Sequence, residues 1–384
     1  MTERRVAHLL LCAPGLTRFE LSQETGLSVA TIGKIIEDLT AAGIVEKIAA
    51  ETSKPGPSLG RPAEYFGLAR SGRRNVVVEL GVKKTQVAAL PIAGPVGDIQ
   101  TATFQTTSDL ETFETRLKAA VARLDIDDPR AVIVSTPGVV DEAEKKVLYS
   151  PNLHWTEGTR LFEVIENVIG VRVVVVQEVR ALALGYLARS DPHDSFLLVD
   201  SGDGVGGALV IDGHLQTGPL PLVAEVGHSR IPGNRRVCGC GAIGCLETIL
   251  TRAGLLKTAR QHSRNRIRNW AQFINEFGSQ DLPNWLNDTL DDASRIIAIA
   301  LNTVGVPKVV LIGDLVDLGS GVLERIAKGV NSDALWGRFG NIRIEAAPKQ
   351  RLLGLTRAAI DRVVFEPTPT EVSLGRHARA NSAG

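Results

Sequence analysis

Three of the four cysteines of the chain lie in one short stretch, CGCGAIGC (238–245), and a histidine lies shortly before it. Three thiolates and one imidazole are a donor set for tetrahedral zinc, and four protein ligands would close the shell of a structural ion. A disulfide is the alternative. One residue separates Cys238 from Cys240, which disfavours an unstrained bridge between them, whereas a bridge from either to Cys245 stays open. The predicted metal ligands are His228, Cys238, Cys240 and Cys245.

The composition is that of a globular chain without a charge bias. The chain has 384 residues, 44% of them hydrophobic, and its 43 basic side chains balance 43 acidic ones. A net charge of zero excludes a uniformly cationic nucleic-acid binder, so any DNA-binding surface must be local. The length allows two or three domains, and no run approaches the roughly 18 apolar residues of a membrane span.

The first residues, MTERRVAHLLLCAPG, resemble a short signal peptide. Their apolar run is brief, and Leu11 before Cys12 is too large for a small-residue cleavage site. We interpret the stretch as the first helix of a soluble domain, with Cys12 as a small core residue. Since clustered cysteines favour a metal over a disulfide framework, we expect a reducing compartment, with the cytoplasm as the default.

The pattern of the first 68 residues predicts a winged helix-turn-helix domain. A helix with apolar residues up to Ala13 ends at Pro14-Gly15, and the capping-box pattern Thr17-Arg18-Phe19-Glu20 begins a second. Ser28 can cap a third helix, which Gly43 ends before a strand at Ile44-Val45. A plain three-helix bundle is the alternative. The apolar stripe of the third helix is Ile32, Ile35, Ile36 and Leu39.

The opposite face of the third helix would present small, polar and basic side chains, which suit a major groove. After it, IAAETSKPGPSLGRPAEYFGL (48–68) has the form of two short strands joined by a Gly/Pro-rich hairpin. An arginine in the extended segment Gly60-Arg61-Pro62 suits the negative potential of a minor groove, and an ordinary solvated loop is the alternative. The predicted DNA-binding residues are Ser28, Ala30, Thr31, Gly33, Lys34, Lys54 and Arg61.

Two later segments repeat one plan. NVVVELGVKKTQVAALPIAGPVGD (75–98) and SFLLVDSGDGVGGALVIDGHLQTG (195–218) each predict a strand, a glycine turn and a second strand. This duplication predicts two similar lobes with a cleft between them. Glycine hairpins facing a cleft can hold phosphates with backbone N–H groups, although tight turns alone also favour glycine. Further strands are predicted at 131–138, 171–176 and 308–314, and helices near 109–124, 160–169 and 350–362.

Two longer stretches carry a family signature: GHSRIPGNRRVCGCGAIGCLE (227–247) and STPGVVDEAEKKVLYSPNLHW (135–155). They resemble the ROK family of sugar-responsive repressors and sugar kinases. The resemblance extends from about Val6 to Phe365, and the winged domain marks the repressor branch. It implies a sugar site in the cleft, with carboxylates that accept hydroxyl hydrogen bonds and a histidine that also ligates zinc. The implied ligand-binding residues are Gly138, Gln177, Glu178, Glu225, His228 and Glu247.

Four positions depart from the pattern of the family's kinases. Gln177-Glu178 replaces an Asn-Asp pair whose Asp is the general base. The first phosphate loop, Asp-x-Gly-Gly-Thr in the kinases, reads ELGVK (79–83). The second reads Gly202-Asp203-Gly204, where Asp203 would repel ATP, and the Gly-Gly near the adenosine reads Gly313-Asp314. The resemblance therefore implies a protein that does not use ATP and is not an enzyme.

The predicted fold is α/β, a winged helix-turn-helix domain (1–68) followed by a two-lobed, actin-like (RNase H-like, duplicated) ROK domain. A linker covers 69–74, and the lobes cover 75–190 and 191–366, with a last helix that could return to the first lobe. The tail 367–384 is expected to be disordered. In the segment around Trp270 we expect a helical apolar stripe that packs in the core or against a second copy.

We predict a sugar-responsive DNA-binding regulator, a repressor with structural Zn²⁺ and no ATP. Its expected partners are a double-stranded DNA operator, a sugar or sugar-phosphate effector, and further copies of the chain in a dimer or dimer of dimers. A sugar kinase that carries a DNA-binding domain is the alternative function, and a DNA-binding scaffold with a dead cleft is a third.

Overall fold

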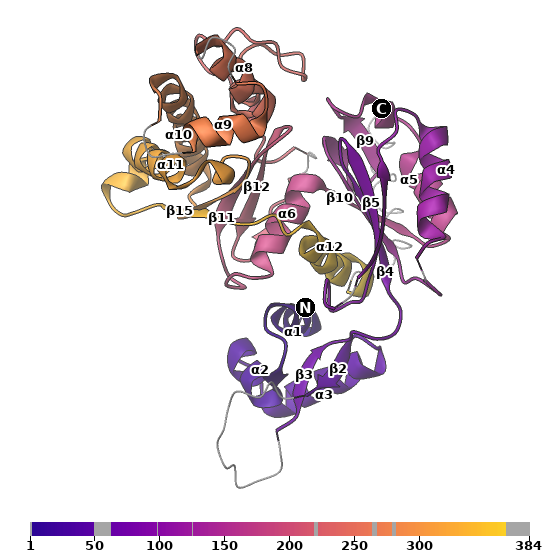
Figure 1. Cartoon of the computed structure of the whole chain (residues 1–384). Helices are drawn as coiled ribbons and strands as arrows, with labels where there is room; N and C mark the ends of the chain where they lie inside the picture. Colours follow the sequence, from indigo (N-terminus) through magenta and orange to yellow (C-terminus); the bar gives the residue numbers. More distant parts are fainter. Residues whose placement is uncertain are drawn as a thin grey trace, which may run out of the picture.

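The computed structural model describes residues 2–49, 63–97, 99–124, 126–218, 222–262, 267–278 and 282–365. The predicted wing residues Lys54 and Arg61 and the predicted tail 367–384 lie outside them. Figure 1 shows two α/β lobes side by side, with the winged domain beneath them. This arrangement confirms the predicted fold class.

The N-terminal domain contains three helices and a small sheet in which β3 lies between β1 and β2. Both predicted caps are present. Thr17 and Glu20 each accept the other's backbone N–H, and Ser28 accepts that of Thr31. The elements are α1 (Thr2–Cys12), β1 (Leu16–Thr17), α2 (Arg18–Thr25), α3 (Val29–Ala41), β2 (Val45–Ile48) and β3 (Tyr65–Leu68).

Two boundaries differ from the prediction by one residue. α1 ends at Cys12, so Ala13 is exposed rather than part of an apolar helix face, because the turn at Gly15 requires a φ of +95°. Gly43 takes a φ of +66°, and the strand begins at Val45 rather than Ile44. The predicted α3 stripe is buried, at Ile32, Ile35, Ile36 and Leu39.

The first lobe is a five-stranded sheet in the order β10-β7-β4-β5-β6. β4 pairs antiparallel with β5 and parallel with β7, and β7 pairs parallel with β10. Its elements are β4 (Asn75–Leu80), β5 (Lys84–Leu90), β6 (Gln100–Gln105), α4 (Leu110–Val121), β7 (Val132–Thr136), β8 (Val139–Asp141), β9 (Lys146–Tyr149), η1 (His154–Thr156), α5 (Leu161–Ile169), β10 (Val173–Gln177) and α6 (Glu178–Leu187).

The second lobe repeats this topology in the order β13-β12-β11-β14-β15, which confirms the predicted duplication. Here β11 pairs antiparallel with β12 and parallel with β14. Its elements are β11 (Phe196–Ser201), β12 (Val205–Ile211), β13 (His214–Leu215), η2 (Val226–His228), α7 (Glu247–Leu250), α8 (Arg252–His262), α9 (Trp270–Phe277), α10 (Asn284–Val304), β14 (Lys308–Gly313), η3 (Val316–Leu318), α11 (Ser320–Asp333), η4 (Leu335–Arg338) and β15 (Arg343–Ala346).

The apolar stripe of α9 packs inside the second lobe. Phe273 and Phe277 are buried in its core, and Trp270 stacks on Phe273 with ring centroids 4.8 Å apart. Of the two predicted roles for this stripe, the structure therefore shows packing in the core.

The chain then returns to the first lobe. α12 (Arg351–Ala359) and the π-helical turn η5 (Ile360–Val364) follow β15, and α12 packs against α6 and the first-lobe sheet. The segment predicted as a linker makes fixed contacts, since Ala69 is buried and the N–H of Arg70 donates to Glu46. None of the helices in the described part of the chain has the length and apolar character that a membrane span requires.

Candidate functional site

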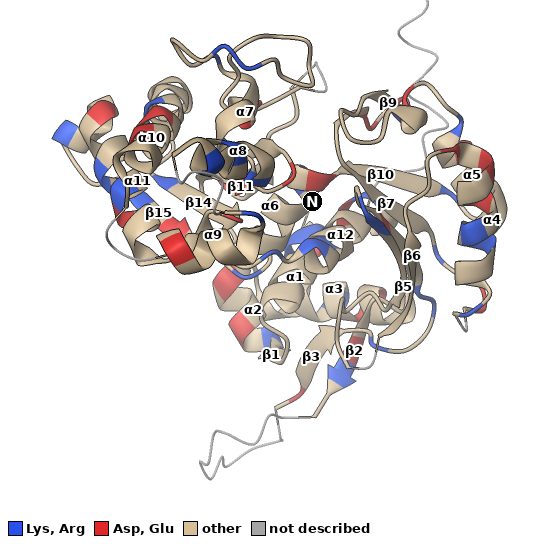
Figure 2. Cartoon of the chain, turned by 45° about the horizontal axis from the view of Figure 1, so that its top comes forward, with Lys and Arg blue, Asp and Glu red and all other residues tan. Residues whose placement is uncertain are grey.

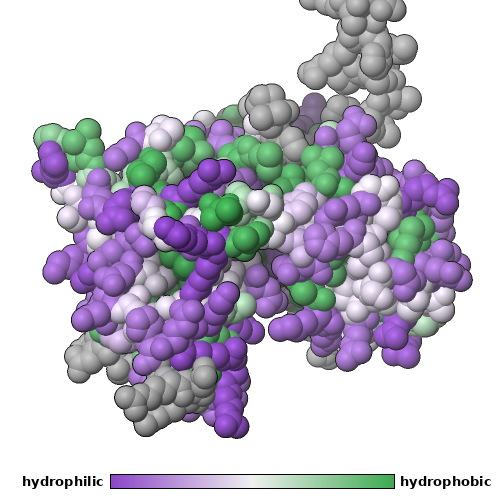
Figure 3. Space-filling model, turned by 90° about the horizontal axis from the view of Figure 1, so that it is seen from above, coloured by the Kyte–Doolittle hydropathy of each residue, from purple (hydrophilic) through white to green (hydrophobic). Residues whose placement is uncertain are grey.

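The two lobes enclose a cavity of about 290 Å³, and the glycine turns of both hairpins line it. Seen from above, the surface is hollowed between the lobes (Figure 3). The volume is near the lower end of the roughly 300–1,000 Å³ that is typical of small-molecule sites. All six residues that the sequence proposed for a ligand line this cavity: Gly138, Gln177, Glu178, Glu225, His228 and Glu247.

On the first-lobe side, the turn after β7 requires a glycine. Gly138 has a φ of +94°, and a Cβ there would lie 2.3 Å from the carbonyl oxygen of Tyr149. Gln177 ends β10, donates from Nε2 to the carbonyl of Gly138 at 3.0 Å, and donates its backbone N–H to Glu142. Because β7 and β10 are parallel, their carboxyl ends bring Gly138, Gln177 and Glu178 to one edge of the sheet.

On the second-lobe side, η2 places Glu225 and His228, and α7 begins at Glu247. Glu247 accepts the N–H of Val205 at 3.1 Å, and the thiol of Cys238 lies 3.4 Å from its other oxygen. Burial raises the pKa of the Glu225 carboxyl, while the nearby His228 opposes that shift. Glu247 is thus held by the backbone of Val205 and lies beside the cysteine loop.

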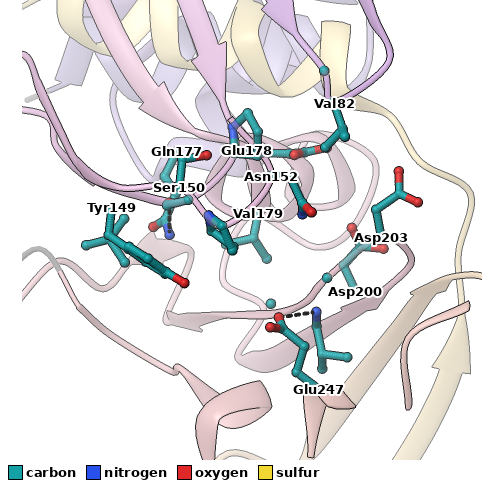
Figure 4. A pocket seen from close by; sticks show the side chains of 18 of the residues that line it. Val82, Tyr149, Ser150, Asn152, Gln177, Glu178, Val179, Asp200, Asp203 and Glu247 are labelled. Carbon is teal, nitrogen blue, oxygen red and sulfur yellow. Dashed lines mark hydrogen bonds between the residues drawn. The ribbon is translucent and has the colours of Figure 1, made fainter. Parts of the chain in front are cut away.

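Polar groups of the two lobes face each other across the cavity. In Figure 4, Gln177 and Glu178 stand opposite Asp200, Asp203 and Glu247. Carboxylate and amide oxygens accept hydrogen bonds from hydroxyl groups. The arrangement can therefore bind a polyhydroxylated molecule between the lobes.

The four predicted metal ligands come together in the structure. One donor atom from each of His228, Cys238, Cys240 and Cys245 lies within 4.8 Å of all the others. Sγ of Cys238 lies 3.7 Å from Nδ1 of His228, and Sγ of Cys240 lies 3.7 Å from Sγ of Cys245. Tetrahedral zinc with bonds of about 2.3 Å to sulfur separates two sulfurs by about 3.7 Å, so the donor set fits zinc.

The disulfide alternative does not fit the same geometry. A disulfide bond is about 2.05 Å long, much shorter than the separation of Cys240 from Cys245, and none of the four cysteines is in a disulfide. Cys12, predicted as a core residue, is only half-buried, because it is the last residue of α1 and exposed residues follow it. Its Sγ lies 4.0 Å from the carbonyl oxygen of Leu187 in α6.

Several acidic side chains form ion pairs at or beside the positions where the sequence differs from the family's kinases. Arg252 holds the buried Asp314 through contacts of 2.6 and 2.9 Å. Lys83 and Asp203 are exposed and 3.8 Å apart, a weak contact. It nevertheless places a positive charge beside the carboxylate that was expected to repel ATP. The pairs are Glu178 with Arg351, Asp200 with Lys349, Asp203 with Lys83 and Asp314 with Arg252.

Burial and charge compete at these carboxylates. Burial raises the pKa of Asp200, and Lys349, 2.9 Å away, opposes that shift. Burial likewise raises the pKa of Glu79, and Arg351 opposes it. The sequence analysis missed both cations, because Arg351 is 173 residues from its partner Glu178 and no local pattern marks it.

The predicted DNA-reading helix, α3, turns its small and polar side chains outward. Ser28, Ala30, Thr31 and Lys34 are exposed, and Gly33 is half-buried. The sequence analysis missed Val29, which is 46% exposed at the start of the same helix. Its methyl groups could contact a thymine methyl in a major groove. In the described part of the chain, five of the seven predicted DNA-binding positions therefore lie together at α3: Ser28, Ala30, Thr31, Gly33 and Lys34.

Gly33→Ala is expected to stabilise the winged domain and weaken its DNA binding. No atom lies within 4 Å of a Cβ built at Gly33, and alanine in a helix interior gains roughly 1 kcal/mol over glycine. The added methyl would stand between α3 and a groove, so affinity should fall several-fold. Unfolding of the purified protein measures the change in stability. The change in affinity is measured with DNA that the wild-type protein has selected from a random library. If stability rises and affinity is unchanged, the outer face of α3 does not contact DNA.

Comparison with known proteins agrees with this geometry. Residues 75–352 match the ROK family, and residues 2–46 match a winged helix-turn-helix DNA-binding domain. The chain is 23% identical over 378 residues to the xylose repressor of Caldicellulosiruptor bescii, which covers 86% of this chain and 88% of that protein. It is 24% identical over 342 residues to the DNA-binding transcriptional dual regulator NagC of Escherichia coli K12, covering 83% and 82%.

A solved structure has the same fold over nearly the whole chain. It is a ROK family transcriptional regulator, a homologue of the E. coli MLC protein, with a TM-score of 0.72 at 21% identity. The match covers 93% of this chain and 95% of that one.

Proposed function

The chain belongs to the ROK family, and on that premise we propose that it is a transcription repressor whose DNA binding responds to a sugar. The proposal rests on one observation: the same chain contains a winged domain and a cleft lined with carboxylates. Two similar proteins are a xylose repressor and a transcriptional regulator. The effector is a sugar or sugar phosphate, and a homodimer presents two winged domains to two half-sites of an operator.

A structural zinc ion supports the sugar site in this proposal. His228 belongs to both the metal set and the cavity lining, and Cys238 contacts Glu247. When bound, the ion would fix the loop 228–247, which carries the cavity residues His228 and Glu247. The four ligands would leave no open coordination position, so the ion has no catalytic part.

The ion pairs support a sensor rather than a kinase. Phosphoryl transfer needs a carboxylate free to take the proton of a sugar hydroxyl. Glu178 occupies that position, and Arg351 is paired with it. Arg252 and Asp314 pair where the resemblance places the adenosine, so a nucleotide would have to compete with a contact of two hydrogen bonds.

A thermal-shift screen of monosaccharides, amino sugars and their phosphates, each with and without Mg-ATP, tests the function. One sugar should stabilise the protein regardless of ATP, by about 2.7 kcal/mol at a concentration a hundredfold above Kd. Glu247→Gln, which keeps the shape but removes the charge, should weaken that response. Stabilisation that depends on ATP, with a phosphorylated product, would establish the kinase. Constitutive DNA binding with no stabilising sugar would favour a dead cleft.

A further inference from the structure

Two helices begin at the cavity and end at the DNA-binding domain. Glu178 is the first residue of α6 and Arg351 the first of α12, and these residues form an ion pair at the cavity wall. Figure 2 shows α6 and α12 close together between the lobes. The side chains are 24% and 21% exposed, so a ligand in the cavity can reach the pair.

The two helices are in backbone contact. A Cβ at Gly354 would lie 1.7 Å from the carbonyl oxygen of Ala181, and one at Gly185 would lie 2.1 Å from that of Gln350. Such close approach leaves no side-chain layer that could absorb a relative shift. A displacement of one helix must therefore move the other.

The far ends of both helices rest on α1. Asp361, just past α12, lies 2.7 Å from Nε2 of His8 and 3.6 Å from Arg4. Arg357 is 3% exposed, and one of its nitrogens lies 3.3 Å from the other ring nitrogen of His8. Cys12 contacts the last residue of α6, Leu187. One apolar cluster also joins the two domains. Ala188 and Ile360, which directly follow α6 and α12, belong to it together with residues of α1 and α3, and so do Ile92 and, from the first turn of α12, Leu353.

The ends of α12 thus contact the two sites that a sugar-responsive repressor must couple. Ten residues separate Arg351 from Asp361, a span of roughly 15 Å in a helix. The contact with α1 is partly buried: Arg357 is buried, and Asp361 pairs with the more exposed Arg4 and lies beside His8. A hydrogen-bonded cluster of this kind fits one arrangement of its partners better than others.

We propose that α6 and α12 move as one unit that transmits occupancy of the cavity to α1 of the winged domain. This inference rests on the proposed function and names the regulation of its site. Sugar hydroxyls that hydrogen-bond to Glu178 compete with Arg351 for the carboxylate. Weakening that pair shifts the start of α12, and the backbone contact carries the shift to the docking of α1. The ligand thereby favours one of two docked arrangements of the DNA-binding domain.

The test compares hydrogen exchange of residues 2–12 in full-length variants without ligand. R351Q and E178Q each break the pair at the cavity end and should speed exchange in α1 by about threefold or more. R325Q is the matched control, because Arg325 pairs with Asp291 between α11 and α10 in the second lobe. It should leave α1 unchanged.

Wild-type exchange of residues 2–12 in both R351Q and E178Q would overturn the proposal. D361N breaks the docking contact itself and must also speed exchange; if it does not, docking is not what protects α1, and the proposal fails. Because no ligand is present, the result is independent of the sugar screen. If no sugar stabilises the protein but the variants exchange faster in α1, the sugar response is wrong, whereas the mechanical coupling between the cavity and α1 is supported.

Discussion

Replacing Cys240 with serine is expected to abolish stoichiometric zinc binding and to unfold the loop that carries the metal ligands. Residues 228–247 contain no long strand, and isolated bridges pair Arg230 with Cys245 and Val237 with Ile243. The backbone hydrogen bonds of this segment close turns and loops, such as those from Ile231 to Gly244 and from Cys238 to Ala242, and no continuous ladder ties it to a sheet. We therefore expect the ion to supply much of the free energy that holds it. Structural zinc sites supply about 10–16 kcal/mol in zinc-finger peptides, and losing one of four ligands forfeits much of that. Metal analysis and thermal unfolding of the purified proteins measure both effects.

Cys12→Ser is the matched control for this experiment. Cys12 lies in α1, outside the metal set, so its substitution should leave zinc content unchanged. Cys240 is exposed, so serine there creates no cavity, and any loss of stability comes from the ion. Because His228 also lines the cavity, the Cys240→Ser protein should lose its stabilisation by a sugar. A full equivalent of zinc in that protein would refute the four-ligand site.

Gly354→Ala is expected to destabilise the two-lobed domain by roughly 3 kcal/mol, at the upper end of the usual cost of overpacking. The added Cβ would lie 1.7 Å from the carbonyl oxygen of Ala181 and 2.7 Å from the backbone nitrogen of Gly185. Backbone atoms cannot rotate away as a side chain can, so α6 and α12 must separate. The midpoint of thermal unfolding measures the effect.

Gly33→Ala provides the control for Gly354→Ala, since it is the same substitution in another helix with open space around it. It should raise stability while Gly354→Ala lowers it. Equal effects of the two substitutions would mean that the helices are not in contact at Gly354. Gly354→Ala should also alter the docking of α1, because it separates the unit that holds that helix.

The sequence by itself determined those features whose cause is local. The capping box of α2 and the Ser28 cap of α3 predict helix starts because their hydrogen bonds join residues three apart. The apolar spacing of α3 predicts its buried stripe. The repeated strand–glycine–strand plan predicts two lobes, since each copy must bury the same faces. The cysteine spacing brings three donors together through one short loop, and His228 is only ten residues from Cys238.

The tertiary structure alone decided which charges meet in the cavity. Glu178 and Arg351 are 173 residues apart, and Asp200 and Lys349 are 149 apart. Neither basic residue lies in a pattern that predicts a partner. Only the return of α12 to the first lobe brings them to the carboxylates, and that return depends on the summed packing of both sheets.

The junction between the domains is likewise a product of the whole fold. The sequence from Ala69 to Arg74 predicts a basic linker, whereas His8, Arg357 and Asp361 form a partly buried contact across 353 residues of chain. Local propensity cannot encode such a contact, because its free energy comes from surfaces that exist only after each domain has folded. The same reason explains why the sequence predicted the ligands of the metal and the wall of the cavity, but not the helices that connect them to α1.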